Sequence, residues 1–160
     1  IEQELIPLCQ HKGLGVVAWS PLAGGFLSGK YAPGQRSLPG ARSESGFVFP
    51  TRFMAPSADE TLRTLLDVSR ELGRPPAQVA LRWLLGRPAV AAAIVGARTL
   101  DQLRDNLLAS TWQLDDESTE RLSAISRLPD RYPESMEREI EERRRAAFMA
   151  ASRPDASGMP

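Results

Sequence analysis

The residues with the clearest chemical potential are a glycine and an arginine that stand between an apolar run and a helix. Gly96 and Arg98 follow the apolar run 91–95, which has the length of a buried strand. Thr99–Gln102 has the sequence of a capping box, which predicts a helix that begins just after Thr99. The free N–H groups and the dipole of a helix N-terminus favour an anion. This stretch suggests a phosphate site, although an ordinary strand–helix unit with a solvated arginine has the same pattern and is the commoner outcome of such a local match.

A second candidate follows an earlier apolar run. Residues 15–19 are bounded by glycine and proline and predict a buried parallel strand. In the next segment, Ser20–Gly25, adjacent glycines and a serine can bring backbone N–H groups close to a phosphate. A plain loop after a strand fits the same residues. Trp19 could stack on a flat ring, or it could belong to the core beside Val16 and Val17.

The other titratable residues give no basis for assigning catalysis or metal binding. His11 is the only histidine and falls in the last turn of a predicted helix, where a structural role is expected because nothing near it in the sequence makes it a base. The tyrosines are Tyr31 and Tyr132, and the lysines are Lys12 and Lys30. We therefore assign no catalytic residue and no metal ligand.

The elements that must position these residues alternate between helix and strand, which is typical of a parallel α/β fold. Ser57–Glu60 is a second capping box, and Asp115 is a predicted helix cap. The long segment 32–56 lacks periodicity, so we expect a lid, a binding loop or disorder, although Phe47–Phe49 suggests packing. Strands are predicted over 15–19 and 91–95, and helices over 1–11, 57–72, 75–85, 100–108 and 116–127.

Composition restricts the class of protein. The 160 residues suit one domain or part of one, and a hydrophobic fraction of 42% can support a packed core. Charges balance at 20 against 20, so we expect no nucleic-acid partner and no membrane surface. No apolar run reaches transmembrane length, and the single Cys9 fits a reducing cytoplasm. The sequence begins at Ile1, so a signal upstream of it would not be seen.

The C-terminal part is strongly charged. A helix is predicted over 137–151, with a thin apolar stripe of Met136, Ile140, Ala147 and Ala151. Glutamate precedes arginine by four residues at Glu134–Arg138, Glu139–Arg143 and Glu141–Arg145, which is the favourable order. We interpret this helix as a solvated extension in preference to a weak partner helix, and we expect 152–160 to be disordered.

Three motifs, taken together, closely resemble the aldo-keto reductases. They are VVAWSPLAGGFLSGKY at 16–31, PPAQVALRWLL at 75–85 and IVGARTLDQLRDNL at 94–107. The resemblance covers roughly residues 1–133. It is specific because the motifs occur in the family's order with suitable spacings, and it supports the phosphate-site interpretation of both candidate stretches.

The resemblance implies the C-terminal portion of a (β/α)8 TIM barrel, followed by a charged helical tail. Residues 1–13 would be the helix after strand six, 16–19 strand seven and 91–95 strand eight. Phosphate sites in such barrels are often built from the loops after strands seven and eight, where both candidate stretches lie. The implied domains are a partial barrel over 1–135, a charged helical extension over 136–151 and a disordered tail over 152–160.

The resemblance also implies contacts to NADP(H) from the first candidate stretch. Trp19 matches an aromatic residue that stacks on the nicotinamide, and Lys30 matches a lysine beside the phosphates. One arginine of the following loop, Arg36 or Arg42, would also reach a phosphate. The loop along the pyrophosphate is matched by Ser20, Pro21, Leu22, Ala23 and Gly24.

The second candidate stretch matches the family's adenosine contacts. Gly96 and Arg98 match the turn that receives the 2′-phosphate, and a dianionic phosphate favours the planar, charged donor that arginine supplies. Gln102, Asp105 and Asn106 match the adenine contacts. Asp105 stands where the family often has glutamate, so its side chain has a shorter reach.

The implied activity is the NADPH-dependent reduction of an aldehyde or ketone to an alcohol by hydride transfer. The family's catalytic aspartate, tyrosine, lysine and histidine lie on and after earlier strands, so this chain is expected to supply the cofactor-binding half alone. The alternative is a non-catalytic nucleotide-binding regulatory or scaffold protein like the potassium-channel β-subunits, because fold does not settle function. The three motifs disfavour a different phosphate-binding barrel enzyme.

Two partners follow from this interpretation: a small carbonyl substrate and the missing N-terminal part of the barrel. Two strands of eight cannot close a barrel, so their neighbours would leave open edges and uncovered apolar helix faces. We therefore expect the chain alone to be aggregation-prone or partly molten.

Overall fold

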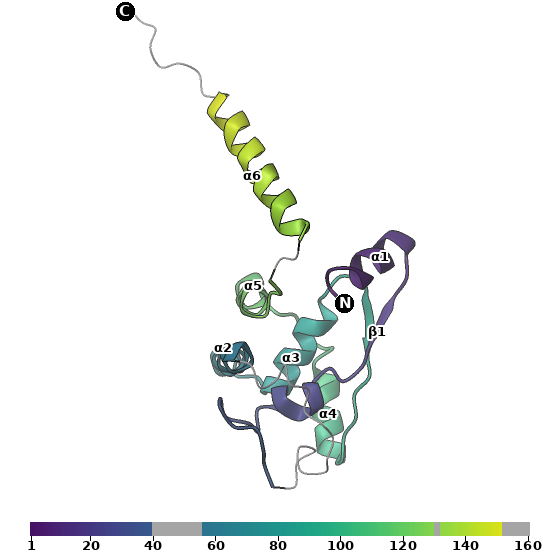
Figure 1. Cartoon of the computed structure of the whole chain (residues 1–160). Coiled ribbons are helices and arrows are strands. Elements are labelled where there is room, and N and C mark those ends of the chain that lie inside the picture. Colours follow the sequence, from purple (N-terminus) through teal and green to yellow (C-terminus); the bar gives the residue numbers. More distant parts are fainter. Residues whose placement is uncertain (40–55, 130–131, 152–160) are drawn as a thin grey trace, which may run out of the picture. The chain divides into compact units, whose positions relative to one another are not determined.

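The computed structural model describes residues 1–39, 56–129 and 132–151. The chain forms two compact units, Ile1–Ser126 and Arg127–Pro160. The predicted packing of Phe47–Phe49 and the predicted disorder of 152–160 lie outside the described residues. The first unit contains α1 (Leu5–Lys12), β1 (Val16–Ala18), the 3₁₀ helix η1 (Ala23–Ser28), α2 (Pro56–Leu72), α3 (Pro76–Leu85), β2 (Val90–Ala93), α4 (Leu100–Leu108) and α5 (Asp116–Ile125), and the second contains α6 (Glu134–Ala151) (Figure 1).

The two strands form a parallel pair, as predicted. Val16 is in register with Val90 and Ala18 with Ala93, with an irregularity after Val16. The Ile94 N–H donates to the Ala18 carbonyl at 2.8 Å, which continues the pairing beyond β2. The carboxyl ends of both strands therefore lie at the same edge, and the segments that follow them start side by side.

The prediction that both strands are buried is wrong. Val17 is 59% exposed, and Ala91 and Ala92 are also exposed. Within the described residues the sheet has two strands, and α3 packs against β2. Apolar runs of strand length are buried only when strands and helices cover both faces, and those covering elements are absent from the described part of the chain.

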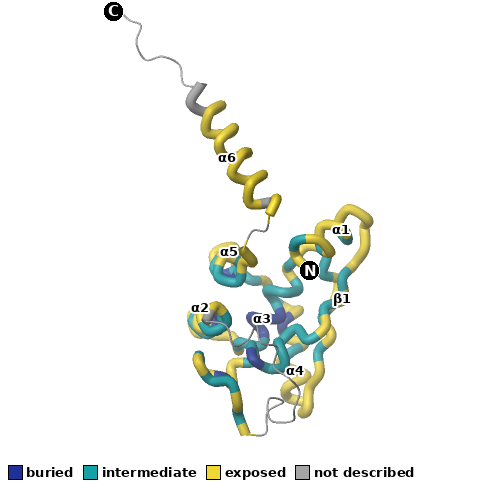
Figure 2. The backbone as a smooth tube through the Cα atoms, in the orientation of Figure 1, coloured by how far each residue is buried: buried dark blue, intermediate teal, exposed yellow. Residues whose placement is uncertain are grey.

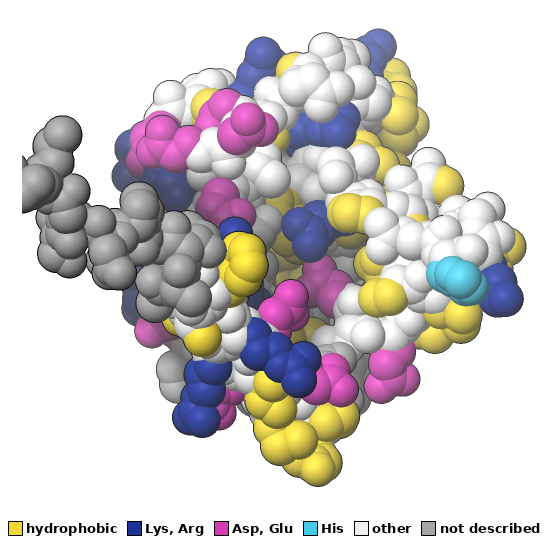
Figure 3. All heavy atoms as spheres, turned by 90° about the horizontal axis from the view of Figure 1, so that it is seen from above, with side chains coloured by type: hydrophobic (Ala, Val, Ile, Leu, Met, Phe, Trp, Pro, Cys, Tyr) yellow, Lys and Arg dark blue, Asp and Glu magenta, His cyan; other side chains and the backbone are white. Residues whose placement is uncertain are grey.

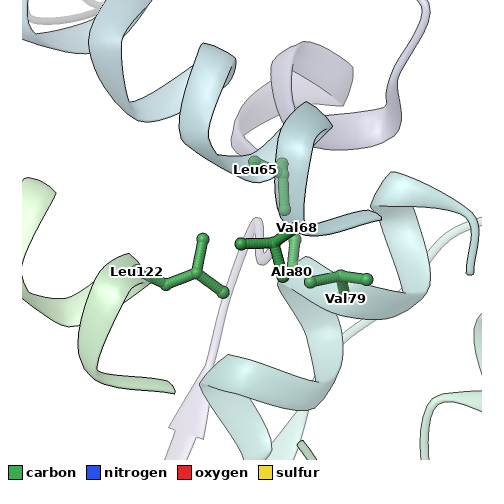
Figure 4. Close-up of a cluster of buried hydrophobic side chains, with 5 residues drawn as sticks. All are labelled: Leu65, Val68, Val79, Ala80 and Leu122. Atoms are coloured by element: carbon green, nitrogen blue, oxygen red, sulfur yellow. The ribbon is translucent and has the colours of Figure 1, made fainter. Parts of the chain in front are cut away.

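The buried core lies among α2, α3 and α5. One cluster joins Leu65 and Val68 of α2, Val79 and Ala80 of α3 and Leu122 of α5, whose side chains converge in Figure 4. A second cluster packs Leu62 of α2 against two aromatic residues, Phe26 and Tyr31. The tube in Figure 2 is dark blue mainly along these helices, whereas α1, β1 and α6 are teal and yellow.

Helix boundaries follow the predicted caps with small shifts. α4 begins as predicted, because Thr99 Oγ1 accepts from the Gln102 N–H at 3.2 Å. α5 also begins as predicted, where Asp115 accepts from the Ser118 N–H at 2.7 Å. α2 begins at Pro56, one residue before the predicted cap Ser57, and α1 begins only at Leu5, so the predicted face of that helix loses its first member.

Several apolar helix faces of the first unit are open. On α4, the predicted leucine face is exposed: Leu100 by 61%, Leu107 by 57% and Leu108 by 44%. Leu5 and Leu8 of α1 are each about half exposed. In Figure 3, yellow hydrophobic side chains lie on the surface, in several places next to charged ones. Among the described residues, no helix combines the length and hydropathy that crossing a bilayer requires.

Candidate functional site

The two candidate phosphate stretches meet in one cleft. The cleft has a volume of about 650 Å3, and its lining comes from the segments after β1 and β2, the start of α3 and α4. All of the predicted site residues except Ala23 line it. These are Trp19, Ser20, Pro21, Leu22, Gly24 and Lys30 from the first stretch, and Gly96, Arg98, Gln102, Asp105 and Asn106 from the second.

The first wall of the cleft begins with an exposed indole. Trp19 is 73% exposed, so the alternative in which it belongs to the core is wrong. Ser20 and Ala23 both have positive φ, at 56° and 51°, which non-glycine residues adopt rarely and at some cost in energy. The Ala23 N–H donates to the Ser20 carbonyl at 2.9 Å and closes this tight turn. The chain therefore holds a strained turn directly beside the indole.

The glycines that follow this turn make room for a lysine. Gly24 and Gly25 have φ values of 67° and 98°, a conformation that glycine adopts without a steric cost. A Cβ atom at Gly25 would lie 3.1 Å from the Nζ atom of Lys30. The ammonium group of Lys30 also lies 5.3 Å from the centroid of the Tyr31 ring. The small residues thus let a cation approach the backbone at the edge of the cleft.

The second wall carries an exposed arginine at the mouth of a capped helix. The Arg98 backbone N–H donates to Gln102 Oε1 at 3.0 Å, and Thr99 caps α4. These two bonds fix the turn from Gly96 to Thr99, so the Arg98 side chain leaves from a defined backbone position. Asp105 and Asn106 lie one turn further along α4 and also line the cleft.

The start of α3 also lines the cleft, which the sequence did not predict. Pro75 and Ala77, at the start of α3, are among the lining residues. The sequence predicted the helix start at Pro75 and Pro76, but no signal in that motif pointed toward the other two stretches. In the structure, Gly29 lets the chain pass close to the start of α3, because a Cβ atom at position 29 would lie 2.7 Å from the Pro76 side chain.

The loop arginine proposed for a phosphate is paired within the protein. Arg36 donates two hydrogen bonds to the Asp59 carboxylate, at 2.7 and 2.8 Å, and does not line the cleft. These bonds, followed by one from the Gly34 N–H at 2.8 Å, lower the pKa of Asp59 to about 2. Arg42 lies outside the described residues, so the choice between the two arginines stays open.

Within the described part of the chain, no tyrosine lines the cleft. Tyr31 is only 2% exposed, packs at 6.0 Å between ring centroids against Phe26, and is not a lining residue. Tyr132 belongs to the second unit. Among the residues that the structure describes, no group of three histidine, cysteine, aspartate or glutamate side chains could hold a metal ion. The described lining of the cleft therefore offers groups that can bind a ligand.

Comparison with known proteins gives a consistent result. The sequence profile of the Aldo/keto reductase family matches residues 1–127. The chain is 40% identical over 126 residues to the oxidoreductase YrpG of Bacillus subtilis (strain 168), covering 78% of this chain and 36% of that protein. It is 36% identical over 115 residues to a probable voltage-gated potassium channel subunit beta of Oryza sativa subsp. japonica, covering 68% of this chain and 34% of that protein.

A solved structure gives the same picture. The chain superposes with a TM-score of 0.51 and 25% identity on the thermostable aldo-keto reductase Tm1743, whose crystal structure contains the inhibitor epalrestat. The superposition covers 78% of this chain and 34% of that one. The chain thus spans about a third of the length of the curated relatives and of the solved structure it matches.

Proposed function

The chain belongs to the aldo/keto reductase family, and we propose that it forms the cofactor-binding part of an NADPH-dependent oxidoreductase. The reaction would reduce an aldehyde or a ketone to an alcohol by hydride transfer. This chain would supply the contacts to the cofactor, while the catalytic aspartate, tyrosine, lysine and histidine would come from residues that precede its first strand in the family's order.

One observation carries the proposal: two stretches far apart in the sequence line the same cleft. Trp19–Lys30 follows β1, and Gly96–Asn106 follows β2. The parallel pairing of β1 and β2 brings the starts of the two stretches together, and the cleft of about 650 Å3 that they line is large enough for a small-molecule ligand.

The residues in the cleft suit a phosphorylated dinucleotide. Lys30 and Arg98 are cations on opposite stretches of its lining, as the separate phosphates of such a ligand require. The glycines of η1 let backbone approach a phosphate, and the exposed Trp19 offers a flat apolar face to an aromatic ring. When bound, the cofactor supplies the hydride that the carbonyl carbon accepts.

Each of these side chains would bind or orient, and none would handle the proton. Trp19 would cover one face of the nicotinamide, so that the opposite face is open to substrate. Arg98 would distinguish a cofactor that carries a 2′-phosphate from one that lacks it, because that phosphate is a dianion and guanidinium is a strong, planar donor. Gln102 would position the Arg98 backbone through its 3.0 Å hydrogen bond.

We further propose that β1 and β2 are strands seven and eight of a (β/α)8 barrel. Their parallel pairing and the exposed faces of α4 and α1 support this placement, because a complete barrel would cover them. The missing earlier strands would then be a required partner, and a small carbonyl compound the substrate. The balanced charge argues against nucleic acid or a membrane surface as a partner, and the single cysteine fits the cytoplasm.

A chimera tests the proposal. In the YrpG chimera, the N-terminal part of the B. subtilis relative precedes Ile1 of this chain. We expect NADPH to quench its tryptophan fluorescence on binding and Trp19→Ala to remove most of that quenching, because Trp19 is the exposed indole in the cleft. Trp112→Phe, a change outside the cleft lining, is the control and should leave the quenching in place. Failure of a folded chimera to bind NADPH would contradict the proposal.

The second candidate function is a nucleotide-binding regulatory or scaffold protein without catalysis. The similarity to the rice potassium channel subunit favours it, and the cleft would hold the same dinucleotide in either case. The residues that precede Ile1 in the whole protein would distinguish the two functions. A protein whose earlier strands end in the family's aspartate, tyrosine, lysine and histidine would support the reductase, and one without them would support the binding module.

A further inference from the structure

The turn that follows η1 is held to the first turn of α2 by one carboxylate. The Gly34 N–H donates to Asp59 Oδ1 at 2.8 Å, and the Arg36 guanidinium donates to both oxygens of Asp59, at 2.7 and 2.8 Å. The turn is also closed within itself, since the Gln35 N–H donates to the Ala32 carbonyl at 2.9 Å. Asp59 therefore binds a compact turn through both its backbone and its side chains.

The Asp59–Arg36 pair is better shielded from water than the Glu71–Arg121 pair at the other end of α2. The Asp59 side chain is 15% exposed and the Arg36 side chain 23% exposed, whereas the Glu71 side chain is 54% exposed. Both pairs are bidentate. A bidentate pair that is shielded from solvent holds its geometry better than an exposed one, so Asp59 keeps the turn in a defined position.

This turn borders the aromatic cluster that includes η1. The Arg36 guanidinium lies 5.9 Å from the centroid of the Phe26 ring, and the Phe26 and Tyr31 ring centroids lie 6.0 Å apart. Leu38, which follows the turn, also packs against this cluster. Release of the turn from α2 would therefore loosen the packing around Phe26, which belongs to η1, and around Tyr31.

The same cluster positions the cation of the first cleft wall. Lys30 lies directly before Tyr31 in the chain and lines the cleft. Its ammonium group lies 5.3 Å from the centroid of the Tyr31 ring. The backbone of Gly25 passes close beside it, because a Cβ atom there would lie 3.1 Å from Lys30 Nζ. The position of the ammonium group thus depends on η1 and on Tyr31, which both pack next to the turn that Asp59 holds.

We propose that Asp59, which does not line the cleft, is a positioning residue that fixes Lys30 and η1 through the turn that carries Arg36. The inference rests on the proposed function, because it concerns how the cofactor wall is arranged before a ligand binds. A phosphate that meets a cation already in place requires less ordering on binding. With the 2′-phosphate assigned to Arg98, Lys30 would serve the phosphates that NADPH and NADH share.

Fluorescence titrations of the YrpG chimera test this proposal. Asp59→Asn should raise the Kd of NADPH and the Kd of NADH by about tenfold each, a size typical of coupling within one network of contacts. The matched control is Glu71→Gln, which breaks a bidentate pair on the same helix and should change either Kd by less than about twofold. A loss for NADPH alone, or equal losses in the two variants, would overturn the proposal.

A double-mutant cycle with Lys30 separates positioning from a general loss of stability. In a Lys30→Met background, Asp59→Asn should raise the Kd of NADPH by less than about threefold, because the cation that Asp59 positions is gone. Circular dichroism at the titration temperature checks that each variant is folded. Equal effects of Asp59→Asn in the two backgrounds would show that Asp59 does not act through Lys30 and would overturn the proposal.

The same titrations distinguish an opposite role for the pair. If Asp59 instead holds Arg36 away from a phosphate that Arg36 could bind directly, Asp59→Asn would free the guanidinium and lower the Kd of NADPH. That result would overturn the positioning role and leave the proposed function intact. A folded chimera that binds neither cofactor would overturn both.

Discussion

At the scale of single residues, Gln102 closes the turn that carries Arg98. Its backbone N–H donates to Thr99 Oγ1, and its side-chain Oε1 accepts from the Arg98 N–H. A capping box normally directs this side chain back to the N–H of the cap residue itself, which here is Thr99. The sequence predicted the motif from its residue types, but it did not predict that Gln102 accepts from the N–H one residue before the cap.

Asp59 provides a prediction on pH. Its carboxylate holds Arg36 and the Gly34 N–H, and these bonds lower its pKa to about 2. A carboxyl whose folded pKa lies below its unfolded value stabilises the fold above the unfolded pKa and loses that effect as the pH falls through the folded pKa. We therefore expect Asp59→Asn to lower the Tm at pH 7, with a difference from wild type that disappears between pH 4 and about 2.

Thermal unfolding of the YrpG chimera, followed by circular dichroism at several pH values, measures this effect. Asp101→Asn is the matched control, because Asp101 is 89% exposed and lies 3.4 Å from its arginine partner, so its pair should contribute little. A Tm difference for Asp59→Asn that stays constant down to pH 2 would mean that the carboxylate does not act through its charge.

At the scale of elements, the helices were predictable because their signals are local. Thr99 and Asp115 cap α4 and α5, and the leucine stripe that begins at Leu62 identified the buried face of α2. The burial of β1 and β2 was not predictable, because a short apolar run such as 91–95 shows only that a strand can be covered. Whether it is covered depends on strands elsewhere in the fold.

The cleft was predictable in part, again because some of its signals are local. Trp19–Gly24 and Gly96–Asn106 contain residue types that bind phosphate, so each stretch could be selected alone. The start of α3 at Pro75 and Ala77 carries no such residue types, and only the packing of α3 against η1 and α4 brings it to the cleft. Arg36 and Asp59 are 23 residues apart in the sequence, so no local pattern predicted that they pair.

The core of the helices gives a prediction on stability. Leu62 has no exposed surface and packs in the cluster that contains Phe26 and Tyr31. Leu62→Ala should lower the free energy of unfolding by about 2–5 kcal/mol, since it removes buried methyl groups and leaves a cavity. Urea denaturation of the YrpG chimera measures this change. Arg63→Ala, at the neighbouring exposed position of α2, is a control expected to cost much less, and an equal cost would contradict the assigned core.

At the scale of the whole molecule, the chain shows apolar surface that a complete barrel would cover. Leu107 on α4 is 57% exposed, so Leu107→Ala should change the stability of the chain alone by less than about 0.5 kcal/mol. In the YrpG chimera the same change should cost about 2 kcal/mol or more, because the added strands and helices would bury the leucine. Equal effects in both contexts would show that α4 is not covered by the added part.

The same reasoning predicts how the chain melts. Alone, it should unfold over a broad temperature range and bind a dye that detects exposed apolar surface, because its two strands leave open edges and faces. The YrpG chimera should unfold in a sharp transition by calorimetry. A sharp, cooperative melt of the monomeric chain alone would contradict the inference that it needs the missing strands.

The central claim is that Arg98 and the strand-end loops of this chain bind a dinucleotide that carries a 2′-phosphate. A fluorescence titration of the YrpG chimera with NADPH and with NADH tests it most directly. Arg98→Ala should weaken NADPH binding by about 1.5–3 kcal/mol and should barely change NADH binding. Arg104→Ala, on the same helix but outside the cleft lining, should change neither. Equal losses for both cofactors on replacing Arg98, or no loss for NADPH, would contradict the claim.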